Sequence, residues 1–422
     1  MSAFRAALFG VACLLCAWSA PAQEYAGTPA SIANPSLRQA LRSVWDSSPE
    51  VQSARAELNA AQARARAAAQ PLYNPTLSLD AENADVNRHT AGLSLALDLS
   101  GKRSARAEQG NAGVQASQAG YDLLRRDIAS RWLRAWSTLA LATQQRQLGE
   151  RRLELMRRFD DLAAQRLKVG DISSPERDLA GLALGEAQIQ QASLVGNQAA
   201  AMATLASISQ DAAANAGALP NALPPASASM AALPLDDYPE LVKARAQQAG
   251  AEAGVQVARR ARVPDPTVSL TGGQVRNGPV NDRVIGLSVS IPLPVLNTGR
   301  AEVDAARAEA DAAAAGVHAQ QLAAKARLRE AQARYDALLD AAQAFRGSRA
   351  AAFDERTALL EKLWRAGEIG TSDYLVQLKQ SLDTALSGLE LQSQAWQAWF
   401  DYLSAAGRLT DWIDGSHKEA SP

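Results

Sequence analysis

The stretch Asn74-Pro75-Thr76-Leu77-Ser78-Leu79 decides how this chain folds, because it occurs a second time as Asp265-Pro266-Thr267-Val268-Ser269-Leu270. Three flanking segments repeat with it, in the same order: Pro49-Glu50 as Pro239-Glu240, Gly92-Leu93-Ser94-Leu95 as Gly286-Leu287-Ser288-Val289, and Lys168-Val169-Gly170-Asp171-Ile172 as Arg365-Ala366-Gly367-Glu368-Ile369. Their separation drifts slowly upward from about 190 residues, far above the period of a solenoid. The chain therefore contains two copies of one large unit whose loops differ slightly.

Each copy changes from a helical to a strand pattern at a pair of prolines. A helical segment over 37–70 ends before Pro71, and its counterpart over 238–262 ends before Pro264. Apolar residues then alternate with small or polar ones. The alternation predicts four strands of about nine or ten residues each, joined in pairs as two hairpins.

These hairpins have two possible settings. They could pack on a soluble core, or they could lie in a membrane, because strands of this length span a bilayer when one face is apolar. Four strands cannot close a barrel, since about eight is the smallest number with a filled interior. Strands in a membrane would therefore have to be pooled by several chains.

The longest regular stretches follow the hairpins, over 101–167 and 299–364, and neither contains proline. A continuous helix of that length would reach about 100 Å. Leucine stands at every seventh position from Leu141 to Leu162, and the second copy keeps the spacing from Leu338 to Leu359. This spacing predicts coiled-coil packing along the helices, and an ordinary long antiparallel bundle accounts for it equally well.

Each long helix is expected to end at a glycine, Gly170 or Gly367, and to be followed by a returning helix. We expect Ser174 to cap the first returning helix, with Pro175 at its first position, and Thr371 to cap the second. Each copy then forms an antiparallel helical hairpin with a tight tip.

The first 22 residues have the pattern of a secretion signal, with Arg5, an apolar run over 6–18 and the cleavage site Ala20-Pro21-Ala22. Both cysteines, Cys13 and Cys16, lie in this segment, so the mature chain is expected to form no disulfide. A lipobox at Cys13 is the alternative, and Gly10 occupies the position where it needs an aliphatic residue.

Composition excludes several functions. The chain has 43 basic and 44 acidic residues and a net charge of −1, which argues against nucleic-acid binding. Its three histidines, His89, His318 and His417, belong to no catalytic motif, so we expect neither an enzyme nor a cofactor. A cation could be held at the outer hairpin by Asp80, Glu82, Asp85 and His89, although a solvated acidic loop is favoured there and no metal site is assigned.

The order of helix, hairpin, very long helix, tight turn and returning helix, twice over, resembles the TolC-like outer-membrane efflux channels. Four stretches are closest to the branch that serves cobalt-zinc-cadmium efflux: Asn74 to Leu79, Gly101-Lys102-Arg103, Pro264 to Thr267, and Ile291 to Asn297. The resemblance implies a mainly α fold with β, in which three chains pool four strands each into a 12-stranded membrane barrel joined to a periplasmic α-helical barrel. It also implies a homotrimer in the outer-membrane lipid.

The resemblance assigns functions to the tips. Two turns are expected to contact a periplasmic adaptor (membrane fusion) protein: Val169, Gly170 and Asp171 in the first copy, and Ala366, Gly367 and Glu368 in the second. Asp373 is expected to form a periplasmic gate, with Glu176 as its weaker counterpart. A ring of three Asp373 side chains would attract cations. The alternative is that Asp373, in the first turn of its helix, only complements the helix dipole. The family's second gate acid is replaced by Val376.

The resemblance thus implies a passive exit duct energised by an inner-membrane RND pump, and the branch resemblance implies heavy-metal cations of the cobalt, zinc, cadmium and nickel class as its cargo. Drugs or organic solutes are the alternative cargo, and a periplasmic coiled-coil adaptor or a hydrolase is a more distant alternative. We expect a signal at 1–22, repeats over 23–210 and 237–409, a linker over 211–236 without periodicity, and a poorly ordered tail over 410–422.

Overall fold

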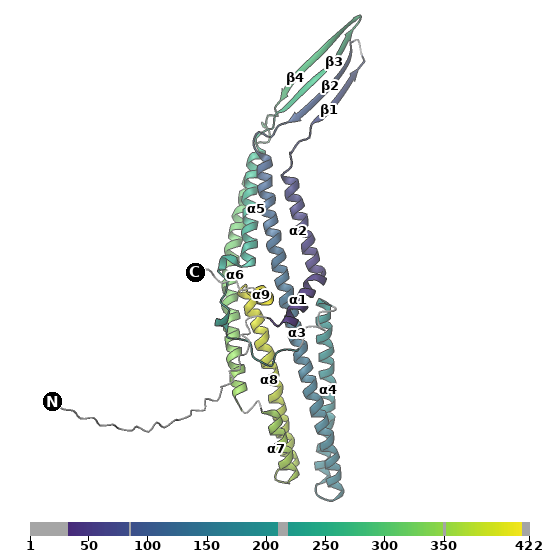
Figure 1. Cartoon of the computed structure of the whole chain (residues 1–422), viewed down its shortest axis with the longest axis vertical. Coiled ribbons are helices and arrows are strands. Elements are labelled where there is room, and N and C mark those ends of the chain that lie inside the picture. The colour runs from purple at the N-terminus through teal and green to yellow at the C-terminus, as the bar shows by residue number, and fades with distance from the viewer. Residues whose placement is uncertain (1–32, 84–85, 210–217, 349–351, 416–422) are drawn as a thin grey trace, which may run out of the picture.

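The computed structural model describes residues 33–83, 86–209, 218–348 and 352–415, so the expected signal at 1–22 lies outside the described residues. The described chain is an elongated wall of helices with a β-sheet at one end and two helical hairpin turns at the other (Figure 1). Helices dominate, and the order of elements in the first half recurs in the second. The predicted mainly helical, duplicated fold is confirmed.

The first helical segment is split in two, which corrects the single helix expected over 37–70. It consists of α1 (Pro35–Ser47) and α2 (Pro49–Ala68). Pro49 causes the break, because a residue that precedes proline is disfavoured in the helical region, and Ser48 has an extended backbone with φ −68° and ψ 122°. The counterpart in the second copy is the single helix α5 (Pro239–Ala261).

The four strands form one antiparallel sheet in the order β1-β2-β3-β4. Their bounds are β1 (Thr76–Glu82), β2 (Val86–Ala96), β3 (Thr267–Asn277) and β4 (Val280–Ser290). Three strands have 11 residues and β1 has 7. The hairpins of the two copies are joined because β2 pairs with β3.

The first long helix is continuous, and the second is interrupted. Helix α3 (Lys102–Lys168) has 67 residues, as predicted. In the second copy α6 (Arg300–Gly347) ends early, Ser348 is extended, and α7 (Phe353–Arg365) follows, so the expectation of one unbroken helix over 299–364 is wrong. A glycine followed by a serine explains the end of α6, since both are weaker helix formers than alanine.

The returning helices are α4 (Ser174–Ile208) and α8 (Thr371–Ala405). Their N-caps are Ser173 and Gly370, one residue before the predicted Ser174 and Thr371, which are instead the first residues of the helices. Among the described residues, no helix is long and apolar enough to cross a membrane.

Residues 409–414 form a helix, which corrects the expectation of a poorly ordered tail for the described part of 410–422. Helix α9 (Leu409–Asp414) buries Trp412 and Ile413 in the main core, which also contains Trp132 and Trp399. The connector also takes part, since Leu219 and Met230 are buried in the same core. This core lies at mid-height, where α1, α3, α8 and α9 meet.

Helix α3 is the central element of the wall, packing on α2 and α5 toward the sheet and on α4 and α8 toward the tips. Its buried residues repeat every seventh position, first as Ala105, Ala112 and Ala119, then as Ala142, Gly149, Met156 and Ala163. The predicted leucine series lies one residue earlier and, except for Leu148, is only half-buried or exposed. The heptad spacing is therefore present, but alanine and glycine occupy the seam within one chain at every one of these positions except Met156, which lets the helices approach closely.

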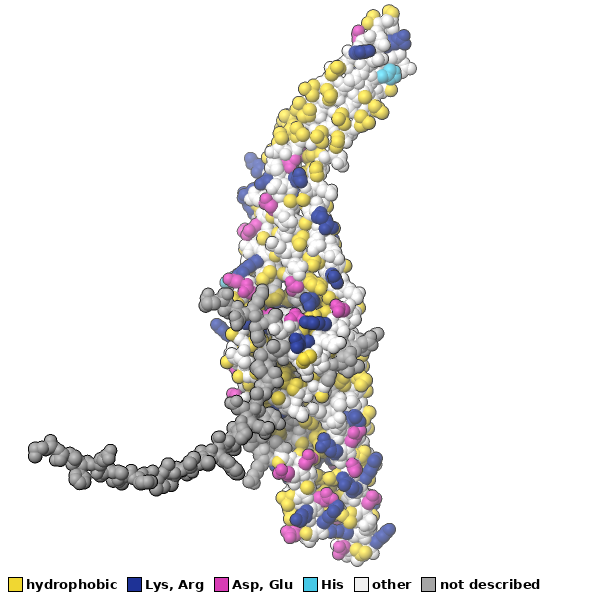
Figure 2. Space-filling view, in the orientation of Figure 1, with side chains coloured by type: hydrophobic (Ala, Val, Ile, Leu, Met, Phe, Trp, Pro, Cys, Tyr) yellow, Lys and Arg dark blue, Asp and Glu magenta, His cyan; other side chains and the backbone are white. Residues whose placement is uncertain are grey.

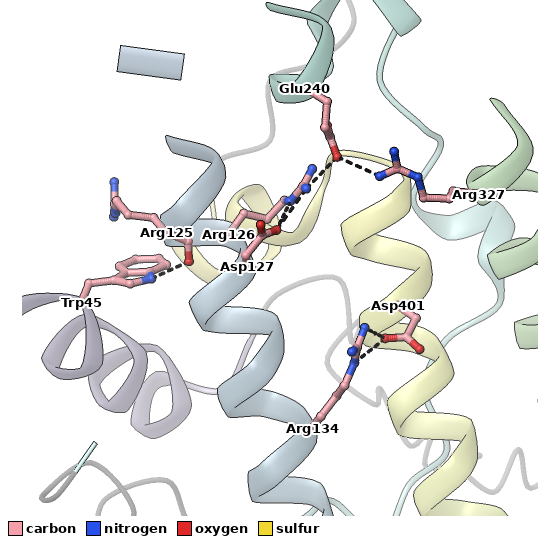
Figure 3. Close-up of polar contacts among 8 residues, drawn as sticks. All are labelled: Trp45, Arg125, Arg126, Asp127, Arg134, Glu240, Arg327 and Asp401. Carbon is pink, nitrogen blue, oxygen red and sulfur yellow. Dashed lines mark hydrogen bonds and ion pairs between the residues drawn. The ribbon is translucent and has the colours of Figure 1, made fainter. Parts of the chain in front are cut away.

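A polar network crosses the wall near this core (Figure 3). Arg126 of α3 donates to Glu240 of α5 at 2.7 Å, and Arg327 of α6 lies 3.7 Å from the same carboxylate. Burial disfavours the charged form of Glu240, yet the hydrogen bond and charge of Arg126 outweigh it and hold the pKa of Glu240 below its ordinary value. The network ties together three helices from both copies.

Candidate functional site: two helical tips and an open sheet

The first tip is a helix C-terminus closed by glycine. Gly170 has φ +80°, a left-handed conformation that side chains other than glycine rarely adopt. Its N–H donates to the carbonyl of Leu167 at 3.1 Å, and the N–H of Asp171 donates to the carbonyl of Arg166 at 2.9 Å. These two bonds form a Schellman motif, which satisfies the last carbonyls of α3 and reverses the chain.

The second tip repeats this geometry residue for residue. Gly367 has φ +75°, its N–H donates to Trp364, and the N–H of Glu368 donates to Leu363, both at 3.0 Å. A Cβ added to either glycine would meet no atom within 4 Å. Both glycines are therefore required by backbone conformation and not by lack of space within the chain.

All six residues predicted at the tips are exposed: Val169, Gly170, Asp171, Ala366, Gly367 and Glu368. Val169 is 78% exposed at the apex of its turn. The two turns lie side by side at the end of the wall opposite the sheet (Figure 1). A partner could therefore contact both turns of one chain at once.

Arg166 joins the two tips, and sequence reasoning missed it. Its guanidinium donates to the carbonyl of Arg365 at 2.9 Å and of Trp364 at 3.5 Å, and it lies 4.7 Å from the centre of the Trp364 ring. A cation at a helix C-terminus satisfies carbonyls that have no helical partner. Its position four residues before Gly170 was the available signal.

An aromatic cluster supports both tips from behind. Phe159, Trp364 and Tyr374 stack with ring centres 4.4 to 5.4 Å apart, and the indole N–H of Trp364 donates to the hydroxyl of Thr371 at 3.3 Å. Burial raises the pKa of Tyr374 to about 12, so it is neutral at physiological pH. This cluster holds α3, α7 and α8 in fixed positions at the tips.

The two predicted gate acids occupy the same helical position and have different surroundings. Glu176 and Asp373 are each the third residue of their helix, α4 and α8. Glu176 accepts hydrogen bonds from the backbone N–H and the hydroxyl of Ser173, both at 2.8 Å, and the backbone bond lowers the pKa of Glu176. Asp373 is exposed and makes no hydrogen bond or ion pair with any described residue. Glu176 is thus engaged in capping, while the Asp373 carboxylate is available.

The sheet has one apolar and one polar face, because directly paired residues project to the same side. Leu77, Leu93, Leu270 and Leu287 form one row across all four strands, and every one is exposed. The adjacent row, on the other face, consists of Thr76, Ser94, Ser269 and Ser288. Hydrophobic side chains cover the part of the sheet nearer the helices, and charged side chains gather at its far end (Figure 2).

The outer hairpin does not assemble a cation site from the described residues. Asp80 pairs with Thr90 and Ala81 pairs with His89, so Asp80 and His89 project from opposite faces. No cluster of three potential metal ligands occurs among the described residues, and Asp85 lies outside them.

A groove of about 510 Å³ lies just above the tips, between α3, α4, α7 and α8. Leu155, Leu182 and Val376 line it together with charged residues such as Arg152 and Glu186. It is open to solvent and belongs to the hairpin end of the wall.

An exposed apolar sheet at one end of a long helical wall is the arrangement expected of an outer-membrane protein with a strand-built membrane segment. The model of the family described as outer membrane efflux protein matches residues 40–209 and 233–408, most of the chain. The chain belongs to this family. The resemblance inferred from its motifs is confirmed, as is its location in the outer membrane with helices that extend into the periplasm. This is a family of transport proteins and not of enzymes.

Two curated relatives concern metal resistance. The cobalt-zinc-cadmium resistance protein CzcC of Cupriavidus metallidurans is 26% identical over 251 residues, 56% of this chain and 58% of that protein. The nickel-cobalt-cadmium resistance protein NccC of Alcaligenes xylosoxydans xylosoxydans is 28% identical over 262 residues, 59% of this chain and 57% of that protein. The matched region thus spans a little over half the length of these relatives.

Among solved structures, a membrane protein from Pseudomonas aeruginosa superposes with a TM-score of 0.73 and 19% identity. The match covers 92% of this chain and 94% of that one. At this identity the likeness establishes the fold alone, and it includes both the sheet and the long helices.

Proposed function

We propose that this protein is the outer-membrane channel of a tripartite efflux system, a passive duct formed by three copies. The amphipathic sheet is the observation that carries the proposal. Its row of exposed leucines needs an apolar environment, and its hydroxyl-lined face suits water. Both edge strands, β1 and β4, are paired on one side only within the chain, so further copies can complete the barrel.

The tips support a role for partners in the periplasm. In this proposal the exposed turns around Gly170 and Gly367 receive an adaptor protein, which connects the duct to an RND pump of the inner membrane. The geometry is suitable because the two turns are alike in their hydrogen bonds, lie close together and are held by Arg166. The pump supplies the energy, and the duct supplies only a route.

Heavy-metal cations of the cobalt, zinc, cadmium and nickel class are the proposed cargo. The names of the two curated relatives support this choice, together with the free carboxylate of Asp373, which suits a gate passed by cations. Deletion of the gene should lower tolerance to these metals, and expression of the intact chain should restore it. Unchanged metal tolerance with new sensitivity to dyes or antibiotics would instead assign the duct to organic solutes.

A further inference from the structure

The internal duplication relates each strand of one hairpin to a strand of the other. Strand β3 corresponds to β1, since Ser269 and Leu270 repeat Ser78 and Leu79. Strand β4 corresponds to β2, since Gly286-Leu287-Ser288 repeats Gly92-Leu93-Ser94. The pairing of β2 with β3 within the chain is therefore a template for the pairing of β4 with β1 of another copy.

The template specifies a register. Within the chain Ser94 pairs with Ser269, and Leu93 pairs with Leu270. Exchanging each residue for its repeat places Ser288 opposite Ser78 of the partner subunit, and Leu287 opposite Leu79 of the partner subunit. This register keeps the leucines on the apolar face and the serines on the polar face. A slip of one residue would turn every side chain of β1 to the wrong face.

The base of the seam between β2 and β3 carries an ion pair that joins the two copies of the unit. The ammonium of Lys102, the first residue of α3, lies 2.7 Å from the carboxylate of Asp265, and their side chains are only 14% and 5% exposed. The hydroxyl of Tyr73 donates to the same carboxylate oxygen at 2.6 Å. Asp265, two residues before β3, is thus locked to the helix that follows β2.

The seam between subunits has only half of this arrangement. Arg300 corresponds to Lys102, since each begins its helix directly after a glycine in the left-handed conformation, Gly299 or Gly101. Asn74 corresponds to Asp265 in the repeated segment, and it carries no charge. Arg300 is exposed and has no ion-pair partner among the described residues of its own chain. Arg300 would therefore meet an amide where Lys102 meets a carboxylate.

We propose that β4 pairs with β1 of a second copy in the register that places Ser288 opposite Ser78, and that Asn74 leaves the base of this seam without the ion pair found within each chain. The inference rests on the proposed trimer and adds its strand register and the distinction between its two kinds of seam. The β2–β3 seam within a chain is held at its base by the ion pair. The β4–β1 seam between chains lacks it, so the strands of this seam should separate first when the trimer dissociates.

Cysteine cross-linking tests the register, because the only two native cysteines stand at positions 13 and 16. The matched pairs are Ser78→Cys with Ser288→Cys, and Leu79→Cys with Leu287→Cys. One of the two matched pairs is of the non-hydrogen-bonded kind, with a Cα separation of about 4.5 Å, which suits a disulfide. The control pairs, Ser78→Cys with Ser290→Cys and Leu79→Cys with Val289→Cys, are displaced by two residues and keep the same faces.

Oxidation of outer membranes with copper phenanthroline should convert a matched pair into linked multimers on denaturing gels. Linkage within one chain is excluded by distance, because three strand spacings separate β1 from β4, about 14 Å. Stronger linkage by a displaced pair than by both matched pairs, or no linkage by either matched pair while unheated trimers persist, would overturn the register. Absence of trimers in the wild-type chain would overturn the proposed function, and the inference with it.

The charge at the base has a separate test. Asn74→Asp should supply the missing carboxylate and raise the temperature at which the unheated trimer band disappears by about 2–4 °C. The double variant Asn74→Asp with Arg300→Gln should lose that gain. An equal gain in the double variant, or no gain in the single one, would contradict the proposed seam.

Discussion

Gly170 and Gly367 have two roles. Each ends a long helix in the left-handed conformation, and each lies in a turn that we propose contacts the adaptor. Replacing either by valine should cost about 1–3 kcal/mol in backbone strain, since each has a positive φ. The tip should be distorted while the sheet and the upper wall keep their structure. We expect the trimer to persist and adaptor binding and efflux to be lost, measured by adaptor pull-down and metal tolerance.

The matched control for these variants is Gly316→Val. Gly316 lies inside α6, and a Cβ there also meets no atom within 4 Å, but its φ is not in the positive range. This variant should retain adaptor binding. If the tip variants lose the trimer and not the adaptor, the glycines are structural caps and the proposed contact is wrong.

Asp373 should control cation passage. In a trimer, three copies of its carboxylate, each without a hydrogen-bond or ion-pair partner among the described residues, would lie close together around the axis. Each charge disfavours its neighbours, and a bound cation relieves the repulsion. Asp373→Asn should weaken cation block and reduce cation preference in single-channel recordings. Asp383→Asn, about three turns further along α8, should change neither property.

Glu176→Gln separates gating from capping. Its carboxylate is already used by Ser173, so we expect a less stable tip and unchanged cation preference. Because the pKa of Glu176 is lowered in the folded chain, its stabilising effect is present at neutral pH and is lost as the pH falls through that lowered value. For Asp373 itself, equal cation selectivity in the wild type and in Asp373→Asn would show that this residue only complements the dipole of α8 and forms no gate.

For single residues, the sequence predicted which positions matter better than it predicted the contacts that each side chain makes. The glycines were predicted because a helix that ends in glycine has a local pattern. The difference between Glu176 and Asp373 depends on the N-cap three residues before each acid, Ser173 or Gly370, and each N-cap lies one position earlier than expected. The position of Arg166 four residues before Gly170 marks a helix end, but its partners, the carbonyls of Trp364 and Arg365, are distant in sequence and no local pattern reveals them.

At the scale of helices, the repeated glutamates provide a matched pair of ion-pair variants. Glu240 bonds to Arg126 across α5 and α3, and its side chain is 15% exposed, whereas Glu50 bonds to Arg131 at 2.5 Å and is 54% exposed. Glu240→Gln should cost about 1.5–3 kcal/mol, because the buried guanidinium of Arg126 loses its buried anion and keeps only the ion pair with the half-exposed Asp127. Glu50→Gln should cost at most about 1 kcal/mol. Thermal unfolding followed by helical circular dichroism measures both.

The pH dependence provides a second readout for Glu240. Since Arg126 holds the pKa of Glu240 below its ordinary value of 4.5, the stabilisation is complete above that value and is lost as the pH falls through the lowered pKa. The Glu240→Gln variant should lack this part of acid destabilisation. An identical acid response in the wild type and the variant would show that the network contributes nothing through charge.

The hairpins and long helices were predictable because period-two and heptad patterns are local and strong. The breaks were harder to predict. Pro49 was present, but the helical composition on both sides of it suggested continuity, and the end of α6 involves no proline at all. The order of α9 depends on the main core, which buries Trp412 only after distant segments have assembled.

Across the whole molecule, duplication turns one hairpin-and-helix unit into a segment of wall whose sheet has two edge strands, β1 and β4. The register of β2 with β3 was not predictable from the alternation alone, because it depends on contact between the two copies. For the same reason, the number of subunits could be predicted only from the resemblance to the family. One chain shows that its sheet is incomplete, and the count of chains depends on contacts outside it.

The central claim is a trimeric duct in the outer membrane, and the behaviour of the native protein on unheated gels tests it most directly. Outer membranes should be separated from the soluble periplasm, extracted in mild detergent and run with and without boiling. A trimeric duct gives a membrane-bound band of three chains that collapses to one chain on boiling. Recovery of the chain as a monomer in the soluble periplasmic fraction would contradict it.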